Sequence, residues 1–204
     1  FLLMLGAAAA DFCDGLAARL LKAGSDFGRE LDSLADDVSF GVLPAVMLCK
    51  LSGTGIPFLR FFPAILAVFS GLRLAKFNLD SRQHSSFLGL PTPASAMICG
   101  SLAYFVTRHP ESFLAGWCSD PVFIPVLTVA LCALLVCEVP MFSMKFATGG
   151  KASSADRLKR IVFLVIVLTA VVLAVVSGLN WSIIVFVSFV GYVLVNLLAF
   201  KSET

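Results

Sequence analysis

The chain has 204 residues, of which 59% are hydrophobic and 14% are charged, and its formal net charge is +2. A mean hydropathy of +0.96 excludes an ordinary soluble globular domain and is typical of a polytopic membrane protein. The small net charge and the absence of a nucleic-acid-binding motif argue against a nucleic-acid partner, and we expect none.

Seven apolar stretches recur along the chain, each long enough, or nearly so, to cross a hydrocarbon layer of about 30 Å. They occupy residues 1–21, 38–52, 57–77, 93–108, 121–142, 160–178 and 181–200. We therefore predict a single all-α domain over residues 1–204, a polytopic membrane helix bundle with seven spans. Because the chain opens at Phe1, without Met and already inside an apolar run, we also expect a truncated N-terminus and an eighth span in the complete protein.

The last two stretches are rich in Val, Leu and Ile and are joined by a short turn. Residues 160–200 contain neither Asp nor Glu, and a short turn at residues 177–180 divides them. We expect residues 1–142 to form the catalytic core helices. Residues 160–200 are then an accessory transmembrane hairpin that faces lipid and carries no chemistry.

Lys and Arg are distributed unevenly between the connections. They crowd into residues 19–29, 73–82 and 145–160, which fall on the same side of the predicted bundle. By the positive-inside rule this side is cytoplasmic. We expect an integral protein of a bacterial or archaeal cell membrane, with any site built on the first connection at the cytoplasmic face.

Four aspartates interrupt the apolar pattern near the N-terminus, namely Asp11, Asp14, Asp32 and Asp36. An isolated Asp at the centre of a membrane helix costs about 2.5 to 3.5 kcal/mol, so these charges need compensation. The spacing puts each pair on one face of a helix, and the short link between the pairs makes the two helices antiparallel neighbours. Hard oxygen ligands suit Mg²⁺ or Mn²⁺. We predict a site for two divalent ions at the membrane interface.

Two glycines share these helix faces. Gly15 and Gly28 each weaken a helix by about 1 kcal/mol relative to Ala. Their position beside the aspartates makes sense if a ligand must approach the helix backbone closely. We therefore expect the two faces to bind a ligand as well as metal.

At these residues the sequence resembles the CDP-alcohol phosphatidyltransferase family, whose signature is D-x2-D-G-x2-A-R-x(n)-G-x3-D-x3-D. Every fixed position is met, by Asp11, Asp14, Gly15, Ala18, Arg19, Gly28, Asp32 and Asp36. Residues 39–45, 73–78 and 89–94 look like the phosphatidylserine synthase branch of this family, with Leu43 in place of Ala and Lys76 in place of Arg. The resemblance covers about the first 140 residues well and the rest by hydropathy alone.

The resemblance implies an enzyme that joins CDP-diacylglycerol to L-serine, giving phosphatidylserine and CMP. It assigns Asp11, Asp14 and Asp32 to two Mg²⁺ or Mn²⁺ ions, and Asp36 to a further metal ligand and the general base. Binding of the CDP-lipid falls to Gly15, Ala18, Arg19, Ser25 and Gly28, although Ser25 also suits an N-cap. The resemblance further implies a homodimer in contact with membrane lipids.

Arg73 and Lys76 stand at the cytoplasmic end of the third predicted span, three residues apart and thus on one face. They are positive-inside anchors, or they form an anion clamp for a lipid phosphate or a substrate carboxylate. Both interpretations stay open.

Other functions compete with this one. The aspartate signature is shared by family members that use glycerol phosphate or inositol phosphate as the acceptor. A membrane prenyltransferase also arranges paired aspartates around Mg²⁺ and diphosphate, but on helices far apart in sequence. A divalent-cation transporter would need acidic residues along a path through the later spans.

Overall fold

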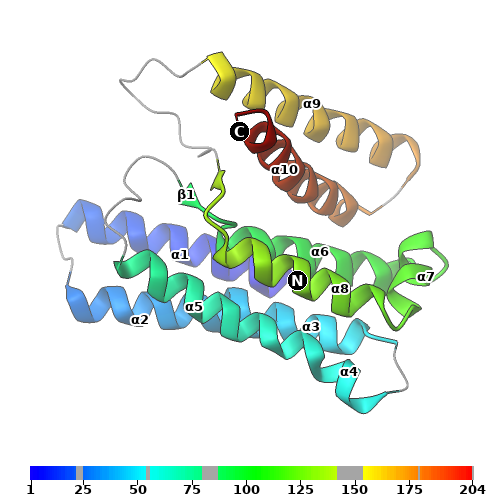
Figure 1. Ribbon diagram of the computed structural model, residues 1–204, viewed down its shortest axis with the longest axis horizontal. Helices are drawn as coiled ribbons and strands as arrows, with labels where there is room; N and C mark the ends of the chain where they lie inside the picture. Colours follow the sequence, from blue (N-terminus) through cyan, green and yellow to red (C-terminus); the bar gives the residue numbers. More distant parts are fainter. Residues whose placement is uncertain (22–24, 54–55, 80–86, 142–153, 179, 204) are drawn as a thin grey trace.

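The computed structural model describes residues 1–21, 25–53, 56–79, 87–141, 154–178 and 180–203. Helices make up nearly all of this part (Figure 1), as predicted for an all-α protein. Their order is α1 (Leu2–Leu21), α2 (Asp26–Asp37), the π-helical turn η1 (Val38–Val42), α3 (Leu43–Leu51), α4 (Pro57–Phe61), the 3₁₀ turn η2 (Phe62–Ala64), α5 (Ile65–Leu79), α6 (Thr92–Arg108), α7 (Phe113–Ser119), α8 (Phe123–Val136), α9 (Ser154–Val176) and α10 (Ser182–Glu203). Two short strands, β1 (Phe87–Leu88) and β2 (Pro140–Met141), pair antiparallel.

The long helices form a bundle, over which the α9–α10 hairpin lies as a further layer (Figure 1). Helix α5 packs on α8, α3 packs on α6, and α10 packs on both α6 and α9. The main apolar core lies where these helices meet and includes Leu48, Leu66, Leu102 and Leu131. A smaller core holds α1 against η1 and α6 through Met4, Phe40, Ala96 and Met97.

Helix α2, η1 and α3 form one unbroken helix. Ser25 begins it as the N-cap, because its Oγ accepts a hydrogen bond of 3.0 Å from the Gly28 N–H. Pro44 lacks an N–H and would break a regular helix here. The wider π turn absorbs it, since the Leu43 N–H donates to the carbonyl of Val38, five residues back. Helix α2, which carries Asp32 and Asp36 and is called the aspartate helix below, and the predicted span 38–52 are therefore a single element.

The predicted span 121–142 is shorter in the structure. Helix α8 covers Phe123–Val136, and the unpredicted helix α7 precedes it at an angle of 90°. Pro121 accounts for the bend, because the residue before a proline favours an extended backbone and Asp120 has ψ 128°.

By length and composition, Phe58–Leu79 is sufficient to cross a membrane, and the bent α7–α8 pair is a second such segment if it is counted as one span. Ile161–Val176 and Ser182–Leu198 are apolar but shorter. Helix α1 carries Asp11, Asp14 and Arg19. The predicted number of seven spans accordingly remains a prediction.

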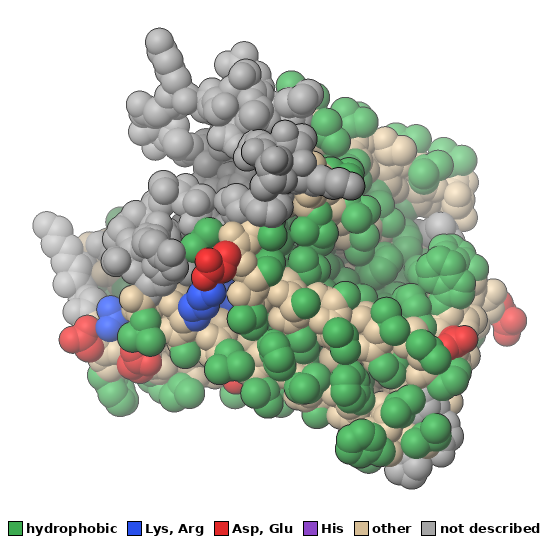
Figure 2. All heavy atoms as spheres, viewed as in Figure 1, with side chains coloured by type: hydrophobic (Ala, Val, Ile, Leu, Met, Phe, Trp, Pro, Cys, Tyr) green, Lys and Arg blue, Asp and Glu red, His purple; other side chains and the backbone are tan. Residues whose placement is uncertain are grey.

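Figure 2 shows apolar side chains over the middle of the visible face, with most charged side chains toward its two ends. On α5 the outward row includes Val68, which is 60% exposed, and Leu72, which is 54% exposed. Such an apolar band between polar ends is what a surface in contact with lipid requires.

Helix α5 approaches the π turn closely at Gly41. A Cβ on Gly41 would lie 2.6 Å from the Ser70 Oγ, 2.8 Å from the Ser70 Cβ and 2.5 Å from the Asp37 Oδ1. Because Gly41 has no side chain, α5 can pack closely against the end of the aspartate helix.

We expect Gly41→Ala to lower the melting temperature of the detergent-solubilised chain, because overpacking costs about 1 to 3 kcal/mol. Gly6→Ala is the matched control, since a Cβ there meets nothing within 4 Å. Equal melting temperatures for the two variants would contradict the close packing.

Candidate metal centre and adjoining cavity

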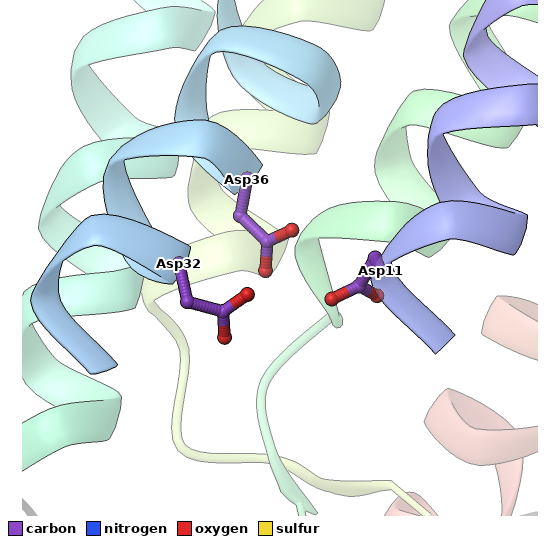
Figure 3. Close-up of side chains that lie close together, drawn as sticks. All are labelled: Asp11, Asp32 and Asp36. Atoms are coloured by element: carbon purple, nitrogen blue, oxygen red, sulfur yellow. The ribbon is translucent and has the colours of Figure 1, made fainter. Parts of the chain in front are cut away.

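Asp11, Asp32 and Asp36 turn their carboxyl groups toward one another across the gap between α1 and α2 (Figure 3). One oxygen from each lies within 4.8 Å of one oxygen from each of the others. The antiparallel α1–α2 pair expected from the sequence therefore brings residues more than twenty positions apart to one point. Carboxylate oxygens converging in this way are the donor set that Mg²⁺ and Mn²⁺ prefer.

Asp14 stands apart from this group of three. Its side chain is exposed, and it lines a cavity beside the cluster. Its charge nevertheless acts on Asp32 and Asp36. The four predicted metal ligands thus form a group of three and a fourth at the rim.

Burial and like charge together raise the pKa of the α2 carboxyls. The pKa of Asp32 is raised, first by burial and then by the charge of Asp14. The pKa of Asp36 is raised to about 7, chiefly by its burial. The three neighbouring aspartates add to this rise, and the guanidinium of Arg73 opposes it. A divalent cation would relieve the repulsion.

No ion pair neutralises the cluster within the part of the chain that the structure describes. The ion pairs there join Arg29 to Asp26 and Glu30, and Lys76 to Glu138. Three converging carboxylates that no described ion pair neutralises, and whose charge only the Arg73 guanidinium is seen to oppose, fit a bound metal.

The cavity next to the cluster lies between α1 and α2 and has a volume of about 480 Å³. Four residues assigned to the CDP-lipid from the sequence line it together, namely Gly15, Ala18, Ser25 and Gly28. Asp14 and Asp32 connect it to the carboxylates. Arg29 also lines it, and the sequence analysis missed this residue although it adjoins Gly28. The cavity is large enough for a nucleotide-sized ligand.

The two glycines of the signature have different surroundings. A Cβ on Gly15 would meet nothing within 4 Å, so packing alone does not require glycine there. A Cβ on Gly28 would lie 3.0 Å from the Ser25 Oγ, which the N-cap hydrogen bond holds in place. The side chain of Arg19 lies outside the described residues.

The side chains of Arg73 and Lys76 have different surroundings in the structure. Arg73 is buried, with its guanidinium over the ring of Phe77 at 5.1 Å from the centroid and within electrostatic reach of Asp36. The Lys76 Nζ instead lies 3.0 Å from the Glu138 Oε1 and 3.5 Å from the carbonyl of Val136. Arg73 therefore lies near the aspartates, and Lys76 holds the end of α8.

A family model described as CDP-alcohol phosphatidyltransferase matches residues 1–136. Three relatives are each named CDP-diacylglycerol–serine O-phosphatidyltransferase. The protein of Bacillus subtilis is 40% identical over 109 residues, which cover 53% of this chain and 60% of the relative. That of Mycobacterium leprae is 38% identical over 152 residues, covering 70% and 48%. That of Methanocaldococcus jannaschii is 32% identical over 148 residues, covering 66% and 71%. The matched regions thus span 48% to 71% of the length of these three relatives.

If the cavity takes the CDP-diacylglycerol that the sequence resemblance implies, Gly15→Ala should keep the fold but weaken its binding about tenfold, because the added methyl would project into the cavity. Binding can be measured by titration of the detergent-solubilised chain, alongside its melting temperature. Gly6→Ala adds a methyl in open space on the same helix and is the matched control. Unchanged affinity in Gly15→Ala would show that the ligand does not approach α1 at this point.

Proposed function

Because this chain belongs to the CDP-alcohol phosphatidyltransferase family, we propose that it transfers the phosphatidyl group of CDP-diacylglycerol to the hydroxyl of L-serine, giving phosphatidylserine and CMP. One observation carries the proposal. The Asp11, Asp32 and Asp36 carboxylates converge beside a cavity that the signature glycines line. The names of the relatives support serine as the acceptor.

The residues of the cluster suit a divalent-metal centre. Asp11, Asp32 and Asp36 would hold Mg²⁺ or Mn²⁺, with Asp14 at the rim of the cavity contributing to a second ion. Bound there, such ions supply charge neutralisation for the pyrophosphate and for the departing CMP.

Asp36 is the proposed general base. Its carboxyl group faces those of Asp11 and Asp32 at the point where the reacting groups would be held, so it is placed to accept a proton there. It takes the proton of the serine hydroxyl as that oxygen forms its bond to the lipid-side phosphorus. The bond between this phosphorus and the oxygen of CMP breaks, and CMP leaves with the electron pair.

The remaining site residues bind and orient the substrates. Gly15, Ala18 and Gly28, with Ser25, line the cavity proposed for the cytidine nucleotide. Arg73, buried next to Asp36, provides a cationic group for a phosphate or carboxylate of the substrates. Lys76, also on α5, supports this arrangement by binding Glu138 beyond the end of α8.

We place the site at the cytoplasmic face of an integral membrane protein of a bacterial or archaeal cell, with seven spans in this sequence and an assembly of two copies. The distribution of Lys and Arg supports the orientation. The apolar surface supports contact with membrane lipids (Figure 2). The diacylglycerol chains would reach the site from the leaflet, and serine from the cytoplasm.

We expect the chain to release CMP from CDP-diacylglycerol with Mn²⁺ or Mg²⁺ when L-serine is present, and to stop when a chelator is added. Parallel reactions contain glycerol 3-phosphate, inositol phosphate or no acceptor. CMP release with another acceptor would support the same phosphatidyl-transfer mechanism but with that acceptor in place of L-serine. Absence of release with every acceptor, from a folded chain that binds Mn²⁺, would favour a prenyltransferase or a cation transporter.

Asp36→Asn should lower kcat by about 100-fold or more, since it removes the proposed base, while largely sparing CDP-diacylglycerol binding. The control is Glu30→Gln, the same chemical change on an exposed side chain of α2. Turnover by Asp36→Asn at the wild-type rate would refute the base assignment.

A further inference from the structure

Asp37 is an aspartate beside the metal centre that the proposed mechanism does not use. It directly follows Asp36 at the end of α2, and one residue along a helix turns the side chain by about 100°. Asp36 faces Asp11 and Asp32 (Figure 3), whereas Asp37 faces α5, where a Cβ on Gly71 would lie 3.5 Å from its Oδ2. The Asp37 carboxylate therefore lies on the α5 side of the metal centre.

This carboxylate has no partner among the described residues. The Asp37 Oδ1 is buried and accepts no hydrogen bond, and the ion pairs of the same residues do not include it. The side chain does not cap η1 either. A buried hydroxyl can turn to donate to a carbonyl of its own helix, but a carboxylate only accepts. Asp37 therefore needs a donor from outside the described chain, because a buried acceptor without one is unfavourable.

Ser70 of α5 faces the same point. Its side chain is 1% exposed, and its Oγ likewise has no hydrogen-bond partner among the described residues. The position that a Cβ on Gly41 would take lies 2.5 Å from the Asp37 Oδ1 and 2.6 Å from the Ser70 Oγ. Helix α5 packs on η1, which carries Gly41. Two buried oxygens from different elements thus converge beside the metal centre.

The chemistry of these two oxygens favours a small cation that carries N–H groups. A single carboxylate balances only half the charge of a divalent ion, whereas a primary ammonium has one positive charge and three donors. Arg73 follows Ser70 by three residues on the buried face of α5 and offers a cation for a carboxylate. An amino acid carries both an ammonium and a carboxylate group.

We propose that Asp37 and Ser70 bind the ammonium group of the acceptor amino acid and thereby select it over glycerol phosphate and inositol phosphate. The Asp37 carboxylate and the Ser70 Oγ each accept a hydrogen bond from the ammonium. Serine carries its hydroxyl and ammonium groups on neighbouring carbon atoms, which matches a base at Asp36 and an ammonium partner at the next residue. This inference rests on the proposed function, because it names the group by which the same site recognises its acceptor.

Asp37→Asn tests the subsite by removing the charge and keeping the size of the side chain. The variant should raise the KM for L-serine about tenfold or more and leave the KM for CDP-diacylglycerol within about twofold. Ser70→Ala removes one neutral acceptor and should raise the serine KM about threefold. Asp120→Asn is the matched control, because it makes the same chemical change on an exposed residue at the end of α7. We expect wild-type KM values from it.

The acceptor analogue 3-hydroxypropionate, which is serine without the ammonium group, separates ammonium binding from a general disturbance of the site. Its inhibition of the serine reaction should be no weaker in Asp37→Asn than in wild type, because the lost charge never contacted it. Inhibition weakened as much as serine binding would overturn the proposal. The melting temperature of Asp37→Asn should not fall below that of wild type, since the described chain gives this carboxylate no partner to lose.

The same measurements separate failure of this inference from failure of the proposed function. A wild-type chain that releases no CMP with any acceptor overturns both. A wild-type chain that releases CMP with L-serine, together with an unchanged serine KM in Asp37→Asn, overturns the ammonium subsite alone. A lower melting temperature with an unchanged serine KM would make Asp37 a structural residue and overturns the subsite as well.

Discussion

The organisation of the site depends on holding like-charged carboxylates together at one side of an apolar bundle. Asp11, Asp32 and Asp36 repel one another, and the partial burial of Asp11 and Asp36 makes this repulsion stronger than it would be in water. An apolar cluster offsets it. Met4 of α1 and Phe40 of η1 are fully buried, or nearly so, against Ala96 and Met97 of α6. Phe40 follows Asp36 by four residues on the same unbroken helix, so the packing lies one turn away from the charges it holds in place.

Helix α5 is the second support of the metal centre. It packs closely against the end of the aspartate helix, where Gly41 faces Ser70. Nearer the start of that helix, the Asn78 amide donates a hydrogen bond to the Ser33 Oγ at 2.9 Å. Along this one helix the two cations have separate surroundings. Arg73 lies in the interior near Asp36, and Lys76 is half-exposed and bound to Glu138. One helix therefore links the aspartate helix, the interior cation and the end of α8.

The C-terminal hairpin is joined to this core by packing rather than by signature residues. Helix α10 lies against α6, and Tyr192 and Val193 enter the main core cluster. The hairpin thus contacts the elements that surround the aspartates, although the family match does not reach it. A helix that looks uniformly apolar along the chain can still bury polar side chains, as α10 does with Ser188 and Asn196.

The sequence by itself determined the helical class, the family and the residues of the α1–α2 site. Local spacing fixes the helix face on which a residue lies, which is why Asp32, Asp36 and the signature glycines could be assigned without coordinates. Only the tertiary structure decided that Asp14 lies at the rim, that Arg73 and Lys76 have different partners, and that the helix continues through Pro44. These outcomes depend on the distance and rotation between helices. Packing among residues far apart in the sequence sets both, and no local pattern records it.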